Sequence, residues 1–391
     1  MRTAFINTLT QAAEKDPRVI LLVGDLGFGV VTEFAKRFPE QFVNVGVAEQ
    51  NMVGVATGLA LSGKIVFTYS IANFPILRCL EQLRNDVCYH KANVISVSVG
   101  GGFSYGALGM THHGTEDIAI MRSLPYMTTI APGDPIETQA ATAAVAKGIG
   151  PVFLRLGRAG EPVVHNHQVR WELGKAITVN EGSDITLIST GAMLKTTVDA
   201  AAELSEKGVN ARVLSMHTLK PIDKKAILDA AHETGGILTI EEHSCIGGLG
   251  GAVAEIIAEE AEKKVCFKRV ALPSEFTKHV GDQDYLRGIY GLTIDGIVEN
   301  SIALLKNGRY REKQKIEPLK MQAEKHLPDI VGINLEYALD TYDWEGWVPM
   351  TDNGITVSGF WDKKRDLQVP EGYVIDDSES FLILASIRGE K

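Results

Sequence analysis

Short apolar runs rich in β-branched residues recur along the first 158 residues, with helical patterns between them. Five runs are expected to be strands, at residues 19–25, 64–70, 93–100, 127–132 and 151–156. Apolar positions at helical spacing fill residues 51–63, 75–91 and 134–148. The last pattern begins at Asp134, a residue type that caps helices well. This alternation predicts a parallel sheet covered on both faces, a doubly wound α/β domain over residues 1–158.

A second series of alternating strand and helix patterns follows after an interruption. Residues 159–182 have no clear period and are expected to form a linker. Residues 183–310 then repeat the alternation and predict a second, smaller α/β domain. The two series are alike in kind, although no repeat is found residue by residue.

The pattern changes again from residue 311, where a charged helix or tether is expected. Three of the four tryptophans lie beyond it, at Trp344, Trp347 and Trp361. Asn353-Gly354 separates two short β-prone runs, which is a strong local signal for a hairpin. Residues 381–389 resemble another strand, so residues 311–391 are expected to end in a small β-rich appendage.

The amino-acid composition and charge of the chain argue against several classes of protein. The chain has 45% hydrophobic and 23% charged residues, as ordinary globular proteins do. A net charge of −10 with no basic block argues against a nucleic-acid partner. The first 16 residues show helical spacing instead of a signal peptide, and no apolar run is long enough to span a membrane. Four cysteines without a CxxC pair predict reduced thiols in a cytoplasmic protein and no zinc site.

Glycine-rich segments invite a comparison with nucleotide-binding motifs. Residues 100–109 and 247–251 do not match GxGxxG, and no GxxxxGK[ST] occurs. A dinucleotide or nucleoside triphosphate enzyme is therefore weakly supported.

Glu49 lies in the small and apolar stretch VNVGVAEQNMVG. A buried carboxyl group costs free energy unless a partner compensates its lost hydration. Glu49 is therefore expected either to bond to backbone amides at a helix start or to bind a ligand.

Five motifs follow one another in an order and spacing that resemble the transketolase-like family of thiamine diphosphate enzymes. They are VGVAEQN, THHGTEDIA, PVFLRLGR, TLKPID and EEHSCIGGLG. The resemblance covers about residues 1–305. It implies a pyrimidine-binding domain followed by a transketolase C-terminal domain.

The resemblance assigns roles at the cofactor. Glu49 would contact N1′ of the aminopyrimidine and favour the imino tautomer, whose exocyclic nitrogen can remove the C2 proton. Phe74 would stack on the aminopyrimidine ring, with Ile71 and Asn73 as further cofactor-binding residues. The alternative for Phe74 is an ordinary core residue.

The resemblance also names candidates for the substrate. His112, with His113 beside it, would contact the C1 hydroxyl and move protons near neutral pH. Arg155 and Arg158 would supply guanidinium groups to the substrate. Ordinary loop histidines and solvated strand-edge charges are the alternatives.

Some positions match the family less well or have a structural interpretation. Gly100 stands where full-length transketolases carry a histidine that helps to hold a sugar phosphate, so phosphate recognition is in doubt. Glu81 and Arg84 are expected to pair along one helix face. Glu116 and Asp117 are expected to cap the following helix.

The family's metal-binding motif is absent. Thiamine diphosphate enzymes hold the diphosphate through Mg²⁺ on a GDG motif with a downstream asparagine, but this chain has only GDL, GDP and GDQ. Asp25 and Asn44 imitate the motif without its second glycine or its spacing, and no metal ligand is predicted here. A separate subunit with the GDG and Asn domain would hold Mg²⁺ and the diphosphate, which implies an α2β2 assembly.

The expected function is the pyrimidine-binding subunit of a two-component transketolase, which transfers a two-carbon ketol unit between sugars. Two alternatives stay open: a beta-type subunit like that of 1-deoxy-xylulose-5-phosphate synthase or 2-oxo-acid dehydrogenases, and a non-catalytic assembly partner. A nucleophile built from His243 and Cys245 is disfavoured, because a lone thiol is inert without groups that lower its pKa.

Overall fold

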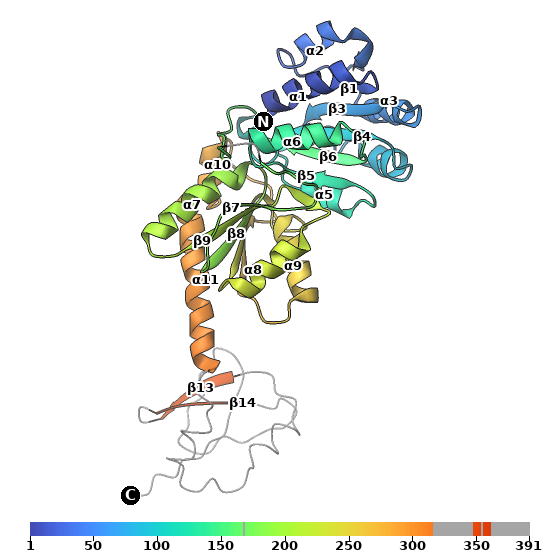
Figure 1. Cartoon of the computed structure of the whole chain (residues 1–391). Coiled ribbons are helices and arrows are strands. Elements are labelled where there is room, and N and C mark those ends of the chain that lie inside the picture. The colour runs from blue at the N-terminus through green and yellow to red at the C-terminus, as the bar shows by residue number, and fades with distance from the viewer. Residues whose placement is uncertain (167–168, 316–346, 353–354, 361–391) are drawn as a thin grey trace, which may run out of the picture. The chain divides into compact units, whose positions relative to one another are not determined.

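The computed structural model describes residues 1–166, 169–315, 347–352 and 355–360 (Figure 1). The chain forms two compact units, Met1–Glu312 and Lys313–Lys391. The first unit contains a sheet of seven strands and a sheet of five. No helix in the described part of the chain is long and apolar enough to cross a membrane.

The larger sheet has six parallel strands in the order β5-β6-β4-β3-β1-β2, with β10 added antiparallel to β5. The strands are β1 (Val19–Val23), β2 (Phe42–Asn44), β3 (Ile65–Ile71), β4 (Val94–Val99), β5 (Thr128–Ile130), β6 (Val152–Leu156) and β10 (Thr218–Lys220). The five strands predicted in this region are all present. The short edge strand β2 was not predicted, because its three residues are half-buried or exposed.

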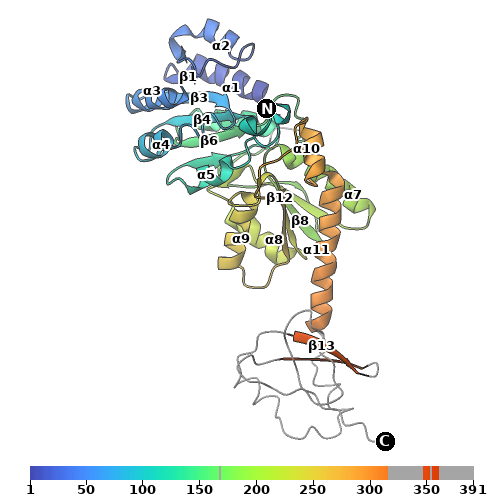
Figure 2. The ribbon, with the colours of Figure 1, turned by 180° about the vertical axis from the view of Figure 1, so that it is seen from behind.

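Alternate side chains of these strands pack against helices on opposite faces. In β1, Leu21 belongs to one hydrophobic cluster and Leu22 to another. The first face is covered by α1 (Arg2–Lys15), α2 (Thr32–Arg37) and α6 (Pro135–Val145) (Figure 1). The second is covered by α3 (Glu49–Leu61), α4 (Leu80–Gln82), the π-helical turn η2 (Leu83–Cys88) and α5 (Asp117–Ser123) (Figure 2). The doubly wound prediction is confirmed, although the helix expected over 75–91 forms only at 80–88.

The smaller sheet has the order β12-β11-β8-β9-β7. Its strands are β7 (Ile177–Asn180), β8 (Ile185–Ser189), β9 (Ala211–Ser215), β11 (Ile237–Ser244) and β12 (Phe267–Leu272). The surrounding helices are α7 (Leu194–Glu206), α8 (Lys224–Glu233), α9 (Leu249–Glu260), α10 (Gln283–Ile289) and α11 (Ile294–Lys315). The predicted second α/β domain is present, but it begins earlier than expected, because β7 lies inside the predicted linker and pairs with β9.

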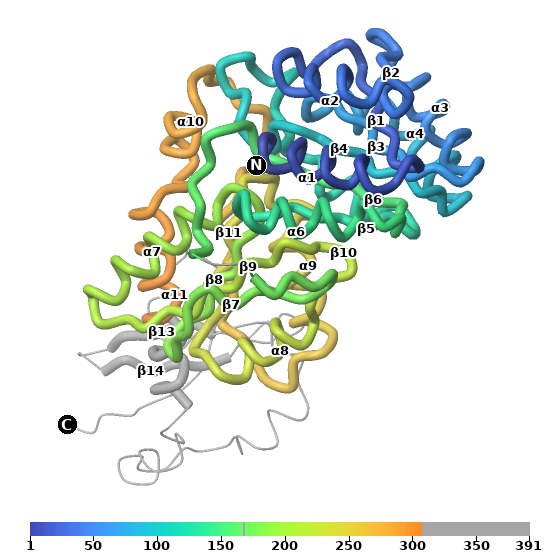
Figure 3. Tube along the Cα trace, turned by 45° about the horizontal axis from the view of Figure 1, so that its top comes forward, coloured from blue at the N-terminus to red at the C-terminus, as the bar shows by residue number. Residues whose placement is uncertain are grey.

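One segment of the second domain completes the sheet of the first. Strand β10 pairs with β5 through Thr218 and Lys220 (Figure 3). The Lys220 ammonium also donates to the carbonyls of Arg122 and Leu124, at 2.8 and 2.5 Å. These contacts help to make the two domains one compact unit.

The second unit contains an antiparallel pair, β13 (Trp347–Asp352) and β14 (Ile355–Phe360). Asp352 pairs with Ile355, as the predicted hairpin requires, while the turn residues Asn353 and Gly354 lie outside the described residues. Helix α11 extends to Lys315, so the start of the predicted tether is helical. The rest of the tether and the strand expected at 381–389 also lie outside the described residues.

Asp134 connects the first domain to the predicted linker. Its buried carboxylate caps α6 by accepting from the amide of Glu137 at 2.8 Å, as the sequence predicted for a cap at this position. It also accepts from the amides of Val164 and His165, at 2.9 and 3.1 Å. The imidazole of His165 lies 2.8 Å from the Glu137 carboxylate. This part of the linker is therefore held by buried hydrogen bonds.

Replacing Asp134 should destabilise the chain measurably. Asp134→Ala leaves one helix amide and two linker amides without an acceptor, so we expect a loss of about 2–4 kcal/mol in the free energy of unfolding. Urea denaturation followed by circular dichroism measures it. Asp134→Asn is the matched control, because it keeps one acceptor oxygen and should lose clearly less. Equal stability of the Ala variant and the wild type would contradict this account of the linker.

Candidate active site

The candidate residues of the first domain lie beyond the carboxyl ends of its parallel strands. Glu49 begins α3 after β2, and Phe74 follows β3. His112 and His113 lie in the loop between β4 and α5. Ligands of open α/β sheets bind at this edge, where the loops converge.

Glu49 is buried, with 2% of its surface exposed, and it is paired with a cation. Its Oε2 accepts a hydrogen bond of 2.7 Å from Nη1 of Arg78. Arg78 is half-exposed, with 45% of its side chain accessible. The buried carboxylate thus has a partly exposed cation as its side-chain partner. No signal in the sequence points to Arg78, since 29 residues separate it from Glu49.

Arg78 also lies over the ring of Phe74. Its Cζ is 4.6 Å from the ring centroid, a cation–π distance. The edge of the His112 ring meets the same Phe74 ring, with centroids 5.3 Å apart. The structure therefore brings together three predicted residues, Glu49, Phe74 and His112, with Arg78 between the acid and the aromatic ring.

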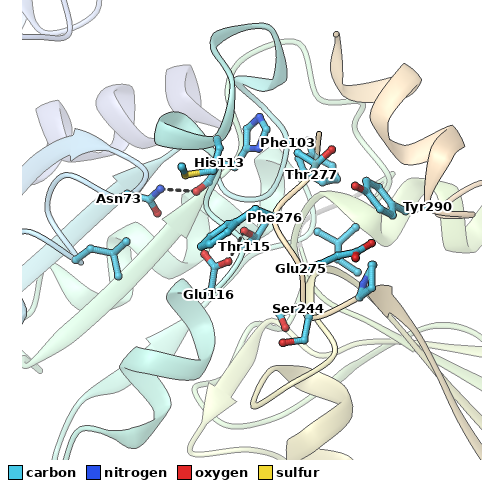
Figure 4. Close-up of a pocket in the computed structure, with 15 residues that line it drawn as sticks. Asn73, Phe103, His113, Thr115, Glu116, Ser244, Glu275, Phe276, Thr277 and Tyr290 are labelled. Carbon is cyan, nitrogen blue, oxygen red and sulfur yellow. Dashed lines mark hydrogen bonds between the residues drawn. The ribbon is translucent and has the colours of Figure 1, made fainter. Parts of the chain in front are cut away.

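Ile71 and Asn73 lie on either side of a bend after β3. Ile71 is the last residue of the strand, and Ala72 has the unusual backbone angle φ of 34°. The Asn73 amide donates to the carbonyl of His113 at 2.5 Å (Figure 4). Asn73 therefore links the loop that carries Phe74 to the loop that carries the histidines.

The two neighbouring histidines have different surroundings. His112 is partly exposed, and its Nδ1 lies 3.0 Å from the Thr111 hydroxyl. His113 is buried, with its Nε2 3.3 Å from the Gly106 carbonyl and its ring 5.0 Å from that of Phe103. Burial lowers the pKa of His113, although the Gly106 carbonyl opposes the change. The accessible histidine beside Phe74 is therefore His112, and His113 is held inside.

A pocket of about 360 Å³ adjoins His113 and lies between the two domains (Figure 4). The first domain contributes Asn73, His113 and Glu116, among others. The second contributes Tyr290 and the segment 272–277 that follows β12. The Thr115 hydroxyl donates to Glu116 inside this lining, at 2.9 Å.

Arg155 is engaged inside the protein. Its side chain is buried, and its Nε donates to Asp117 at 2.8 Å. Its Nη2 donates to the carbonyls of Gly114 and Glu242, at 2.7 and 3.0 Å. This geometry occupies the Arg155 guanidinium with structural contacts, whereas the sequence predicted a substrate ligand. Arg158 is exposed, with its guanidinium 5.6 Å from the ring centroid of Tyr105.

The structure also shows the partners of two further pairs of residues that the sequence singled out. The expected pair of Glu81 and Arg84 is replaced by a 2.7 Å bond from Arg84 to Asn85. Asp25 and Asn44, the imitation of a metal motif, bond to each other through two contacts of 3.0 Å. Among the residues that the structure describes, no group of three or more His, Cys, Asp or Glu side chains is arranged to hold a metal ion.

The fold and the site together define a two-domain α/β protein with a buried acid, an aromatic ring and a histidine at one sheet edge. Two family models match this chain: the transketolase pyrimidine binding domain over residues 1–160 and the transketolase C-terminal domain over residues 174–297. The chain belongs to the transketolase family.

Similar proteins agree with this assignment. The chain is 40% identical over 307 residues to a subunit of the apulose-4-phosphate transketolase of Phocaeicola vulgatus, and the match covers 78% of this chain and 97% of that one. It is 38% identical over 312 residues to the 6-deoxy-6-sulfo-D-fructose transketolase subunit SqwH of a Clostridium species, covering 80% and 96%. A solved split gene transketolase, described as an inactive beta4 tetramer, has a TM-score of 0.70 and 38% identity, covering 78% and 97%.

A substitution separates the two roles considered for Arg155. Arg155→Met leaves the buried Asp117 carboxylate without its cation, so we expect a loss of about 3–5 kcal/mol in the free energy of unfolding. Arg158→Met removes an exposed charge and should stay within about 0.5 kcal/mol of the wild type. Urea denaturation of both variants measures the difference. A stable Arg155→Met variant with a raised KM would restore the substrate-binding interpretation.

Proposed function

We propose that this chain is the pyrimidine-binding subunit of a two-component, thiamine diphosphate-dependent transketolase that transfers a two-carbon ketol unit between sugars. The observation that carries the proposal is the contact of Arg78 with both Glu49 and Phe74. The relatives named above support it, since two are transketolase subunits and this chain covers at least 96% of their length.

The residues present fit the aminopyrimidine part of the cofactor. The guanidinium of Arg78 is planar, bonds to a carboxylate and lies on an aromatic ring. An aminopyrimidine ring offers the same two contacts, through its ring nitrogen and its face. Glu49 would hold the proton at N1′, and Phe74 would orient the ring, with Ile71 and Asn73 shaping the bend behind it. When bound, thiamine diphosphate supplies the nucleophilic carbon that the twenty ordinary side chains lack.

Other residues would act on the substrate. His112 is partly exposed beside Phe74, where it would donate and accept protons at the substrate hydroxyl. His113 is buried and would hold the loop in place. Arg158 is the exposed cation of the predicted set and would bind an anionic end of the sugar. The names of the two relatives include a phosphate and a sulfo group, and both groups are anionic.

The partner subunit would supply the other half of the site. No GDG motif occurs in this chain, and Asp25 and Asn44 satisfy each other. We therefore assign Mg²⁺ and the diphosphate to a separate subunit with the GDG and Asn domain. Pairing the two halves across chains gives an α2β2 hetero-oligomer.

Reconstitution tests the two-component assignment. The purified chain should bind thiamine diphosphate poorly and show no ketol transfer, because its sequence has no GDG motif and the residues that the structure describes offer no group of metal ligands for the charged diphosphate. Adding the GDG-bearing subunit with Mg²⁺ should restore both, as measured by calorimetry and a coupled transketolase assay. Robust activity of this chain alone would overturn the assignment.

Glu49 is the residue on which cofactor activation rests. In the complex, Glu49→Gln keeps the shape but cannot hold the N1′ proton as a carboxylate does, so we expect kcat to fall by about 10²–10⁴-fold. The exposed Glu181→Gln is the matched control and should leave kcat unchanged. Size-exclusion chromatography should show the same assembly for both variants. Full activity of Glu49→Gln would favour a non-catalytic role for this chain.

A further inference from the structure

Glu242 is a buried carboxylate of β11 that the mechanism above does not use. Only 3% of its surface is exposed, and its oxygens accept from three other residues. Arg287 donates to it at 2.6 Å, and the Gln283 amide donates at 2.9 and 3.1 Å. Both of these donors belong to α10, in the second domain. The third donor is the backbone amide of Phe103 in the first domain, at 2.9 Å.

Glycine makes this contact between the domains possible. Gly102 has a backbone φ of 63°, and a Cβ atom there would lie 2.6 Å from the Glu242 side chain. Any larger residue would clash with the carboxylate and would also be strained. The glycine-rich segment 100–109, which matches no nucleotide motif, therefore brings a backbone amide within reach of a carboxylate of the second domain.

Phe103 connects Glu242 to the loop that carries His112 and His113. Its ring meets His113 edge-on, with centroids 5.0 Å apart, and it also stacks on the Tyr290 ring of the second domain at 5.7 Å (Figure 4). The backbones of the two loops are also joined, since Gly102 and Gly114 exchange two hydrogen bonds of 2.7 and 3.0 Å. Displacing Phe103 would therefore move or hydrate His113.

We propose that Glu242 of the second domain is a positioning residue for His113, acting through the backbone amide and the ring of Phe103. The second domain thereby sets the geometry and hydration of the loop that carries His112 and His113. This inference rests on the proposed function, in which that loop faces the substrate. It gives the second domain an indirect part in the reaction of the first, through Phe103.

The charges around His113 come from both domains. His112 and Glu116 lie on its own loop, and Glu242 faces it from the second domain. Burial is the largest influence and lowers the pKa of His113, whereas the two carboxylates act in the opposite direction. Because burial dominates, loss of Phe103 packing should raise the pKa of His113 toward its ordinary value.

Histidine C2–H exchange measured by mass spectrometry reports the pKa of His113 in the full chain, alone and with its partner subunit. Glu242→Ala should raise this pKa, because release of Phe103 hydrates His113, and this effect should exceed the opposite effect of losing the Glu242 charge, since burial is the largest influence on His113. In the complex it should lower kcat by about tenfold with little change in KM. Glu255→Gln is the control, because it disrupts a different contact between the domains, the 2.8 Å ion pair of Arg122 and Glu255, without contacting Phe103. It should change neither quantity.

Phe103→Leu keeps the test decisive if Glu242→Ala does not fold. It removes the ring beside His113 but keeps an apolar side chain, and it should raise the pKa of His113 in the same way. The proposal fails if Phe103→Leu, or a folded Glu242→Ala, leaves the pKa of His113 and kcat unchanged. Absence of ketol transfer in the wild-type complex, with the pKa change still present, would instead count against the proposed function alone.

Discussion

The hydrogen bonds of the buried Arg155 guanidinium are the interactions on which the arrangement of the site depends. From β6 it reaches Asp117 at the start of α5, the carbonyl of Gly114 beside the histidines and the carbonyl of Glu242 in the second domain. An unpaired charge in such a place is costly, and these contacts compensate the lost hydration of the guanidinium. One side chain thereby joins a strand, a helix, a loop and the neighbouring domain.

Close packing around this guanidinium restricts the neighbouring loops. A Cβ atom at Gly101 would lie 2.6 Å from the Arg155 guanidinium, and one at Gly102 equally close to Glu242. The loop that carries Phe103 can thus approach both charges only because it lacks side chains there. Together with β10, which adds a strand of the second domain to the first sheet, these contacts explain why residues 1–312 form one unit.

Glu49 is a buried acid whose charge a neighbouring cation compensates. Its partner Arg78 is half-exposed, so this cation can leave the carboxylate at a smaller cost than a fully buried one. The guanidinium holds the carboxylate and covers the Phe74 ring at the same time. In the proposed function, the aminopyrimidine of the cofactor would use both surfaces.

Elements with a local signal could be predicted from the order of residues alone. Runs of β-branched residues predicted β1, β3 and β4, and a capping aspartate marked the start of α6 at Asp134. The ordered motifs also led to the family and to Glu49, Phe74 and His112 as candidates. The short strands β2, β7 and β10 required the folded structure, because all three lie at the edge of a sheet and form through pairing with a neighbouring strand. The partners of Glu49, Arg155 and Glu242 also required the folded structure, because they lie 29 to 139 residues away along the chain. Burial and charge compensation depend on neighbours in space and not on neighbours in the sequence.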